Sequence, residues 1–433
     1  MSAHIFPLKC AIQEYAWGKV GLDSEVAQLA VDTVDGFRLD LETPYAELWM
    51  GTHARGPSTN ASTGETLSSY ISRHPVPCCG TVVPQRFPAC VAGELPFLFK
   101  VLSVNMALSI QVHPDKANAE RLHRERPSEY PDPNHKPEMA IALSRFEALV
   151  GFRPTPEIAS FLDGIPELRK VIGDRLACIL SVARDEAAMK PALHDCFLAL
   201  MNCKEVLWKE QLEILNARLL EAERFRENNI LERCAGDLFL RIHKHFPSDI
   251  GCFCIYFLNF VVLEPGEAIF LDANLPHAYL YGNCLECMAC SDNVVRAGLT
   301  PKLKDVATLC SILDYTSIPV SGTILASKRK VDDPYITIYQ PPVAEFAVEK
   351  IVLPQGTRDY VVPPVDGPTI VIFINGNGVA CSADNDCPVI PIKRGIVLFV
   401  GAKDRLSLTA ETNTCDDLLL FRALCPYSVP CNY

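Results

Sequence analysis

The chain has 433 residues, of which 49% are apolar and 21% charged, a composition typical of soluble globular proteins and unlike that of disordered ones. This length predicts two or three domains with a sizeable core. The net charge of −12 argues against nucleic acid and anionic membranes as partners. A phosphorylated ligand would therefore need a local basic cluster within an acidic protein.

The cellular location is predicted from three features. The N-terminal segment MSAHIFPLKC lacks the apolar stretch of a signal peptide, and no apolar run reaches the 18 residues of a membrane span. The 19 cysteines are scattered through apolar segments. We therefore expect reduced, mostly buried thiols and a cytoplasmic protein.

Residues 1 to about 150 alternate short apolar runs with Gly, Pro and Ser turns, which predicts β structure. The most apolar run, from Leu95 to Ile110, predicts a buried strand or hairpin. It leads into SIQVHPDK, where Gln111 and His113 are two residues apart and face the same side of a strand. Such a pair can hold a metal ion, or it can simply cap a strand.

Two later segments favour the metal. NHKPEMA contains Glu138, and LDANLPHAYL contains His277. Two imidazoles, one carboxylate and one amide oxygen form a donor set that zinc accepts. Sequence separation does not establish proximity, so from the residues alone each of these side chains keeps a structural alternative.

The rest of the chain divides into stretches that differ in the spacing of their apolar residues. From Thr155 to about His245, apolar residues recur three and four apart among Leu, Glu, Arg and Ala, which predicts helices. β texture returns at Gly251, so we predict a helical insertion (155–250) in one β domain (1–154 and 251–316). Short strand patterns predict a second β-barrel over 317–433, with Asn375-Gly376 as a hairpin turn signal. No histidine follows His277, so this barrel holds no histidine metal site.

The chain resembles a known family. The motifs QVHPDK, NHKPEMAIAL, FEALVGFRP, PHAYL and ECMACSDNVVRAGLTPK occur in this order and at these separations in type I mannose-6-phosphate isomerases. YAWGK and PYAELWMGTH resemble the same family, and the likeness to eukaryotic members extends to about Thr316, more weakly beyond. The resemblance implies a mainly β fold with an α-helical insertion, namely two cupin-type jelly-roll β-barrels, the second degenerate, plus a helical domain.

The resemblance also implies an activity and a site. The expected reaction interconverts D-mannose 6-phosphate and D-fructose 6-phosphate through an enediol or enediolate, which supplies mannose for GDP-mannose synthesis and glycosylation. The family's metal ligands fall on Gln111, His113, Glu138 and His277, with one Zn²⁺ per chain, and its catalytic arginine falls on Arg296. Its other cleft residues fall on Lys100, Ser109, Lys136, Tyr279, Glu286, Asp292 and Lys302.

This ligand set suits the chemistry. Moving a proton between C1 and C2 develops negative charge on O1 and O2, which a Lewis acid stabilises. Zn²⁺ with one carboxylate leaves a net charge of about +1, whereas a second carboxylate would neutralise that field. Four protein ligands require five-coordination when water or substrate binds.

The roles of individual residues stay open at this stage. Arg296 could bind the phosphate with two parallel hydrogen bonds or stabilise the enediolate. From the residue alone the structural alternative is favoured, because a lone Arg is more often a surface residue. Either Glu286, with a pKa raised by burial, or Lys136 could carry the proton. Pro137 favours an extended backbone before it, so His135 and Lys136 should point to opposite faces. We favour Lys136.

The sequence also contains features of other classes of protein. CLECMAC places Cys284, Cys287 and Cys290 in a spacing typical of iron–sulfur proteins, but the fourth position holds Val294. A non-catalytic bicupin that binds a sugar or stores nutrients is the main alternative, and a cupin dioxygenase would need a different ligand set. We expect a monomer whose partner is a small sugar phosphate, with no nucleic acid and no membrane.

Overall fold

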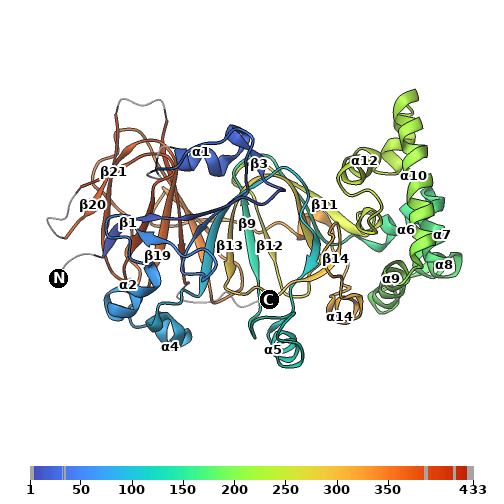
Figure 1. Cartoon of the computed structure of the whole chain (residues 1–433), viewed down its shortest axis with the longest axis horizontal. Coiled ribbons are helices and arrows are strands. Elements are labelled where there is room, and N and C mark those ends of the chain that lie inside the picture. The colour runs from blue at the N-terminus through green and yellow to red at the C-terminus, as the bar shows by residue number, and fades with distance from the viewer. Residues whose placement is uncertain (1–3, 32, 34–35, 385–388, 413–415, 427–433) are drawn as a thin grey trace.

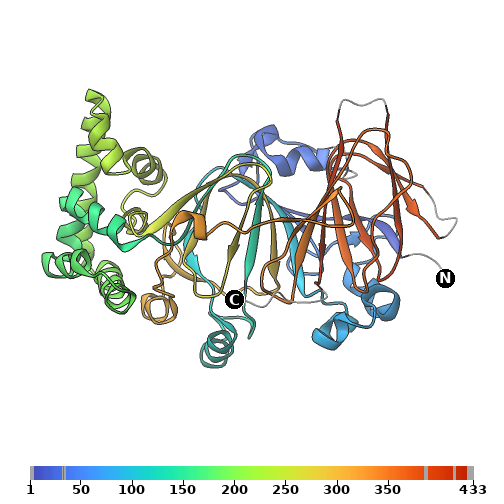
Figure 2. The same ribbon diagram turned by 180° about the vertical axis from the view of Figure 1, so that it is seen from behind.

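The computed structural model describes residues 4–31, 33, 36–384, 389–412 and 416–426. Three parts follow one another along the longest axis of the molecule (Figure 1). A strand-rich part formed mainly by the C-terminal third lies at one end, and a second strand-rich part lies in the middle. The helical part lies at the opposite end, as the view from behind also shows (Figure 2). The prediction of a mainly β chain with a helical insertion is confirmed.

The central part is one ten-stranded antiparallel sheet assembly. Its strands are β2 (Ala11–Gln13), β5 (Glu47–Met50), β7 (Phe97–Val104), β8 (Ile110–Val112), β9 (Glu138–Ala142), β10 (Phe146–Phe152), β11 (Leu258–Leu263), β12 (Ala268–Leu271), β13 (His277–Ala289) and β14 (Val295–Gly298). The long strand β13 pairs with β7, β8, β9 and β10. It therefore brings together segments that lie far apart in the sequence.

A bulge in β13 sets which of its side chains face the interior. The register of β13 against β10 shifts between its pairs with Glu147 and Ala148, which reverses the alternation of side chains along the strand. Gly282 follows with φ of +113°, and a Cβ there would lie 2.4 Å from the Arg145 carbonyl oxygen, so only glycine fits. As a result Tyr279, before the bulge, and Glu286, after it, face the same interior and hydrogen-bond to each other.

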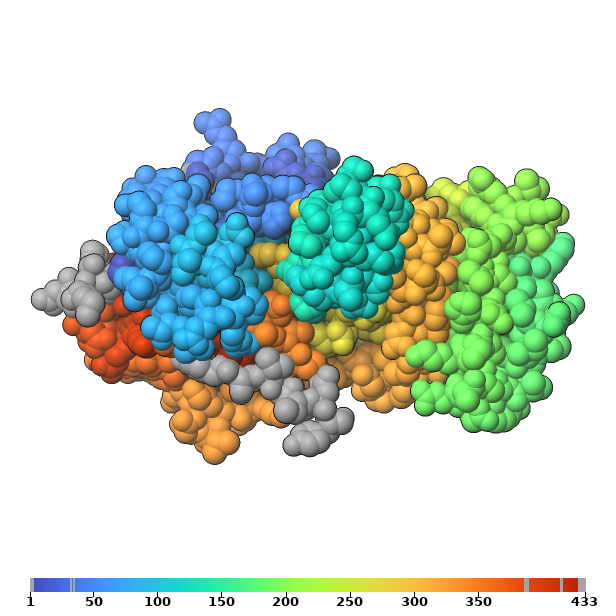
Figure 3. Space-filling model, turned by 90° about the horizontal axis from the view of Figure 1, so that it is seen from below, coloured from blue at the N-terminus to red at the C-terminus, as the bar shows by residue number. Residues whose placement is uncertain are grey.

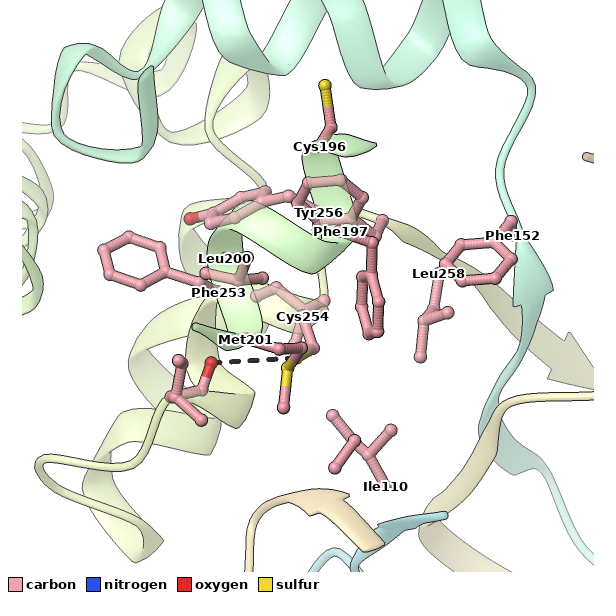
Figure 4. Packing of buried hydrophobic residues seen from close by; sticks show 14 of the residues in the cluster. Ile110, Phe152, Cys196, Phe197, Leu200, Met201, Phe253, Cys254, Tyr256 and Leu258 are labelled. Carbon is pink, nitrogen blue, oxygen red and sulfur yellow. Dashed lines mark hydrogen bonds between the residues drawn. The ribbon is translucent and has the colours of Figure 1, made fainter. Parts of the chain in front are cut away.

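The helical part lies where the apolar spacing predicts it, except at its end: β structure is expected from Gly251, but residues 251–254 form a helix and the strand β11 begins only at Leu258. Its helices are α6 (Thr155–Gly164), α7 (Pro166–Ile172), α8 (Asp174–Val182), α9 (Glu186–Met201), α10 (Glu205–Phe225), α11 (Asn228–Arg233), α12 (Gly236–His245) and α13 (Gly251–Cys254). Its core continues into the sheet. Figure 4 shows Phe253, Cys254 and Tyr256 packed near Phe197 of α9, with Ile110 of β8 facing the same cluster.

The C-terminal part has two sheets that share a core. The larger contains β15 (Lys328–Arg329), β16 (Ile336–Tyr339), β17 (Ala347–Leu353), β24 (Leu418–Leu424), β19 (Thr369–Asn375), β22 (Val397–Val400), β1 (Ile5–Lys9) and β6 (Thr59–Asn60). The smaller contains β18 (Tyr360–Val361), β23 (Leu406–Ala410), β20 (Gly378–Ser382) and β21 (Ile390–Ile392). The N-terminal strand β1 thus extends a sheet formed mostly by the end of the chain.

Of two local expectations, one differs from the structure and one is confirmed. The chain does turn at Gly376, where φ is +81°, but β19 and β20 belong to different sheets, so the hairpin predicted at Asn375-Gly376 is wrong. The turn carries the chain from one sheet to the other. The run from Leu95 to Ile110 is predicted to form a buried strand or hairpin, and the strand is confirmed as β7, all of whose residues are buried. β7 and β8 both pair with β13 rather than with each other.

Short helices interrupt the β texture of the first 150 residues. They are η1 (Gly21–Asp23), α1 (Glu25–Val31), α2 (Leu67–Arg73), α3 (Pro75–Cys79), α4 (Val83–Arg86), η2 (Pro88–Ala92) and α5 (Lys116–Glu125). The remaining elements are the strand pair β3 (Lys19–Val20) and β4 (Pro44–Tyr45), then α14 (Val306–Ile312) and η3 (Val320–Gly322). Within the described ranges, no helix is both long enough and apolar enough to span a bilayer.

Candidate metal and substrate site

Strand register brings four of the predicted site residues to one face of the central sheet. Gln111 of β8 lies opposite His277 of β13 on one side and opposite Arg296 of β14 on the other. Directly opposed residues of antiparallel strands project to the same face. His113 follows two positions after Gln111 and shares that face. Ile110 and Val112, which alternate with Gln111 and His113 along the chain, point the other way, into the core shared with the helices.

His113, Glu138 and His277 form a compact group. Within the described ranges they are the one set of three or more potential metal ligands whose ligand atoms all lie within 4.8 Å of one another. Glu138 lies between the two rings, with Oε1 at 3.5 Å from His113 Nε2 and Oε2 at 3.4 Å from His277 Nε2. All three side chains are buried. The structure thus brings together residues that the sequence separates by up to 164 positions (277 − 113).

The hydrogen bonds behind the rings orient both histidines toward a metal. His113 Nδ1 lies 2.7 Å from the Asn293 carbonyl oxygen, and His277 Nδ1 lies 2.9 Å from the Leu275 carbonyl oxygen. A carbonyl only accepts, so each Nδ1 donates, and each Nε2 keeps its lone pair for the site. His113 Nε2 is buried without a hydrogen-bond partner, and burial lowers the pKa of His113 to about 4. A neutral, buried, unpartnered nitrogen fits a metal ion.

Glu138 is the anionic member of the group. Burial works to raise its pKa, but the charge of Lys136 and contacts with the two histidines lower the pKa of Glu138 well below its usual value. Lys136 Nζ lies 2.8 Å from Glu138 Oε1. His135, the preceding residue, instead contacts Glu345, with 2.7 Å between Nε2 and Oε1. The two neighbours therefore point to different partners, as the extended backbone before Pro137 predicts.

Gln111 lies at the edge of this group. Its Nε2 is 3.4 Å from His277 Nε2, and its Oε1 accepts a hydrogen bond from Ser109 Oγ at 3.3 Å. The two ends of an amide group exchange places on a 180° rotation about the terminal bond. Such a rotation directs the oxygen toward His277 Nε2, which is the arrangement that a fourth metal ligand requires.

A buried charged network lies beside the metal ligands. Lys100 Nζ is 2.9 Å from Glu286 Oε2 and 3.7 Å from Glu47 Oε2, and the Tyr279 hydroxyl donates to Glu286 Oε1 at 2.9 Å. Burial disfavours the ammonium, but Glu286 and Glu47 raise the pKa of Lys100. Burial, with the negative charges of Glu138 and Glu47, raises the pKa of Glu286 despite the opposing charge of Lys100.

Glu47 is a further buried residue of the site that the sequence motifs did not predict. It lies in PYAELWMGTH, where Glu47 and Trp49 are two apart on β5, and Trp49 Nε1 donates to Glu47. A glutamate in a strand with four buried residues is a signal of a buried partner. Asn293 was missed as well, because a backbone carbonyl that orients a ligand leaves no mark in side-chain chemistry.

The remaining predicted residues, Arg296, Lys302 and Asp292, have neighbours other than the three clustered ligands. Arg296 and Lys302 border a cavity of about 230 Å³ together with Tyr130 and Asp305, and burial lowers the pKa of Arg296. Asp292 contacts Arg55 and His53 instead of the metal ligands. In the space-filling view from below, α5 lies between the α2–α4 segment and the orange residues near position 300 (Figure 3). Yellow atoms, in the colour of the β11–β13 stretch, are visible between α5 and the α2–α4 segment.

The CLECMAC segment is part of β13 and is no cluster site. Cys284 faces one hydrophobic core and Cys287 faces another, because alternate residues of a strand point to opposite faces. Throughout the described residues, no three cysteines come close enough to share a metal. The iron–sulfur alternative is therefore excluded for this segment.

Comparisons with known proteins point to one family. Models of type I phosphomannose isomerase match residues 5–155 (catalytic domain), 171–258 (helical insertion domain) and 337–379 (C-terminal domain). Mannose-6-phosphate isomerase of Bos taurus is 47% identical over 426 residues, covering 97% of this chain and 98% of that protein. That of Homo sapiens is 46% identical with the same coverage.

Solved structures are similar over almost the whole chain. The apo form of mannose 6-phosphate isomerase from Salmonella typhimurium has a TM-score of 0.80 at 30% identity, covering 98% of this chain and 100% of that one. A zinc-bound mannose 6-phosphate isomerase gives the same values. The likeness therefore extends to sequence, fold and all three parts of the molecule.

Proposed function

This chain belongs to the type I phosphomannose isomerase family, and we propose that it works with one zinc ion held by Gln111, His113, Glu138 and His277. It is an aldose–ketose isomerase that interconverts D-mannose 6-phosphate and D-fructose 6-phosphate. The observation that carries the zinc proposal is the buried group of His113, Glu138 and His277, whose ligand atoms lie within 4.8 Å of one another.

The donor set supports one zinc ion per chain. Two neutral imidazoles, one carboxylate and one amide oxygen are ligands that zinc accepts, and they leave a net positive charge. When bound, zinc supplies Lewis-acid stabilisation of negative charge on the sugar oxygens. The carbonyls of Asn293 and Leu275 keep the two histidines in the tautomer that such a site needs.

We assign the proton transfer to Lys136. Its Nζ reaches Glu138 at 2.8 Å, so it lies next to the ligand group where the reacting carbons would bind. Both oxygens of Glu286, in contrast, are engaged by Lys100 and Tyr279. We therefore propose that Glu286 and Lys100 shape the charge of the site, while Lys136 holds and moves the proton.

Arg296 is the proposed stabiliser of the developing negative charge. Its place opposite Gln111 in the strand register and its partial burial support this role. Lys302 and Ser109 are proposed to bind the phosphorylated substrate, since Lys302 borders the same cavity as Arg296 and Ser109 contacts Gln111. Asp292 is proposed to orient Arg55 and His53 at the entrance.

Wider features stay as proposals. The catalytic domain is assigned to 1–154 and 251–316, the helical domain to 155–250 and the C-terminal domain to 317–433, with the two sheet assemblies as cupin barrels. The N-terminal strand β1 pairs with β22 of the C-terminal domain, which supports direct packing of the first domain against the last. We also propose a cytoplasmic monomer that feeds GDP-mannose synthesis and glycosylation.

Metal analysis with an activity assay tests the zinc proposal. Purified protein should contain about one zinc per chain, and formation of fructose 6-phosphate from mannose 6-phosphate should stop with chelator and return with zinc. His113→Ala and His277→Ala should lose metal and activity together. Full activity in protein verified to be free of metal would refute the proposal. The alternative of a non-catalytic bicupin predicts no turnover in any of these samples.

A further inference from the structure

Asp249 joins the helical insertion to the segment that carries Lys302. It lies between α12 and α13, with 12% of its side chain exposed. Its Oδ1 accepts hydrogen bonds from the backbone N–H groups of Gly251 and Leu299, both at 2.7 Å. Its Oδ2 accepts one from the Thr300 N–H at 3.3 Å and lies 3.5 Å from Lys304 Nζ. One carboxylate thus holds the segment that begins directly after β14.

The backbones at this junction are in close contact. A Cβ added to Gly298 would lie 2.5 Å from Gly251 Cα, and one added to Gly251 would lie 2.6 Å from the Leu299 nitrogen. Leu299 has φ of +53°, a left-handed conformation that is costly for leucine. The two Asp249 contacts at Leu299 and Thr300 offset that cost and fix the direction in which the chain leaves β14.

The segment that follows Asp249 is densely packed. The residues that follow it, from Cys252 to Leu258, are all buried. In Figure 4 Phe253, Cys254 and Tyr256 lie within the packed cluster, and Cys254 Sγ contacts the Ile250 carbonyl oxygen. At the other end of the segment, Asp305 contacts Arg126 and Tyr130. Residues 299–305 are therefore a short bridge held at both ends, with Lys302 near its middle at the cavity that Arg296 also borders.

We propose that Asp249 is a positioning residue for substrate binding: it holds residues 299–304 so that Lys302 lies at the Arg296 cavity. This rests on the proposed role of Lys302 in binding the sugar phosphate. The assignment gives the helical insertion a part in the reaction, because its last turn sets the shape of the substrate cavity. β14 itself is held by its pairing with β8, so Arg296 should keep its place when Asp249 is changed.

Two substitutions of Asp249 test this. Asp249→Ala removes all four contacts, whereas Asp249→Asn keeps one carbonyl oxygen for Gly251 and Leu299. We expect Asp249→Ala to raise KM for mannose 6-phosphate on the order of tenfold, with kcat within about twofold of wild type and zinc content unchanged. Asp249→Asn should give a smaller rise, and it serves alone if the alanine variant does not fold. Hydrogen exchange at the Leu299 and Thr300 amides should accelerate in the same order.

Asp314→Ala is the matched control. Asp314 also joins the helical insertion to a later segment, through Lys190 Nζ at 2.9 Å, and its loss should leave KM unchanged. The proposal is overturned if the Leu299 and Thr300 amides exchange faster while KM stays at the wild-type value, or if kcat alone falls. Wild-type KM in Lys302→Ala would instead refute the role given to Lys302. Faster amide exchange in the Asp249 variants would still show that Asp249 holds the segment, so the two failures are distinguishable.

Discussion

Gln111 and Arg296 lie directly opposite each other across the antiparallel pair formed by β8 and β14. A proposed metal ligand and the proposed charge-stabilising group therefore share one strand pair and one face. The opposite face of that pair, with Ile110, Val112 and Val295, packs into the core of the helical insertion. Backbone hydrogen bonds thus set the separation of the Gln111 and Arg296 backbones, and side-chain substitutions leave them in place.

Arg296 should act on the rate of the chemical step. Its planar group donates several hydrogen bonds in a fixed arrangement, and Lys reproduces only the charge. We expect both Arg296→Lys and Arg296→Ala to lower kcat by roughly ten- to a thousandfold while zinc stays bound. Steady-state kinetics with mannose 6-phosphate and metal analysis measure both effects. If KM rises and kcat holds, Arg296 only anchors the phosphate. Wild-type values of both would remove it from the site.

Gln111→Glu tests why this ligand is neutral. The added carboxylate should keep zinc bound, since it is a good zinc ligand. It should lower kcat, because a second negative charge opposes the charge that develops on the substrate. The comparison is with Gln111→Asn, which keeps the neutral amide but shortens its reach. An unchanged kcat in Gln111→Glu would contradict the charge argument and leave the ligand assignment standing.

Much of the fold could be predicted because its signals are local. The helical spacing from Thr155 to His245 coincides with the start of α6 and the end of α12, and apolar strand runs such as TIVIFI in β19 are visible in the sequence. The pairing of strands is less local. Nothing near Asn375 shows that β19 and β20 enter different sheets, because that choice depends on partners tens of residues away.

The residues of the candidate site likewise differ in how far the sequence alone predicts them. Residues with distinctive chemistry, such as His113, Glu138 and His277, were identified from motifs of the family. Residues that act through a partner were not: Glu47 matters because Lys100 lies 3.7 Å away, and Asp249 because two backbone amides lie 50 or so residues along the chain. Such roles depend on contacts made only in the folded chain.

Lys136 and Glu286 should fail in different ways when substituted. Lys136→Arg keeps a positive charge beside Glu138 but does not release a proton at neutral pH, so kcat should fall about a hundredfold or more with zinc retained. Glu286→Gln should mainly lower stability, by about 3 kcal/mol, because it leaves Lys100 buried with a weaker partner. Urea unfolding and kcat, measured on both variants, separate the two roles. Near-normal kcat in Lys136→Arg would mean that a group other than Lys136 carries the proton.

Asp305 should contribute a pH-dependent part of the stability. Partial burial works against its ionisation, but hydrogen bonds from Thr308, Tyr130 and Arg126 lower the pKa of Asp305 to about 2 from 3.8. Between these values the unfolded chain binds more protons than the folded one, so this contribution is complete above about pH 4 and is lost as pH falls toward 2.

The expected size of the Asp305 contribution is on the order of 2 kcal/mol. Asp305→Asn should therefore lower the free energy of unfolding by about 1–2 kcal/mol at pH 7, and the difference from wild type should shrink as pH falls below 4. Urea unfolding at pH 7, 5, 4 and 3 measures this. Asp332→Asn, at an exposed carboxylate, is the matched control and should show no such trend. A difference for Asp305→Asn that stays constant down to pH 3 would mean that Asp305 contributes through helix capping of α14, independently of its charge.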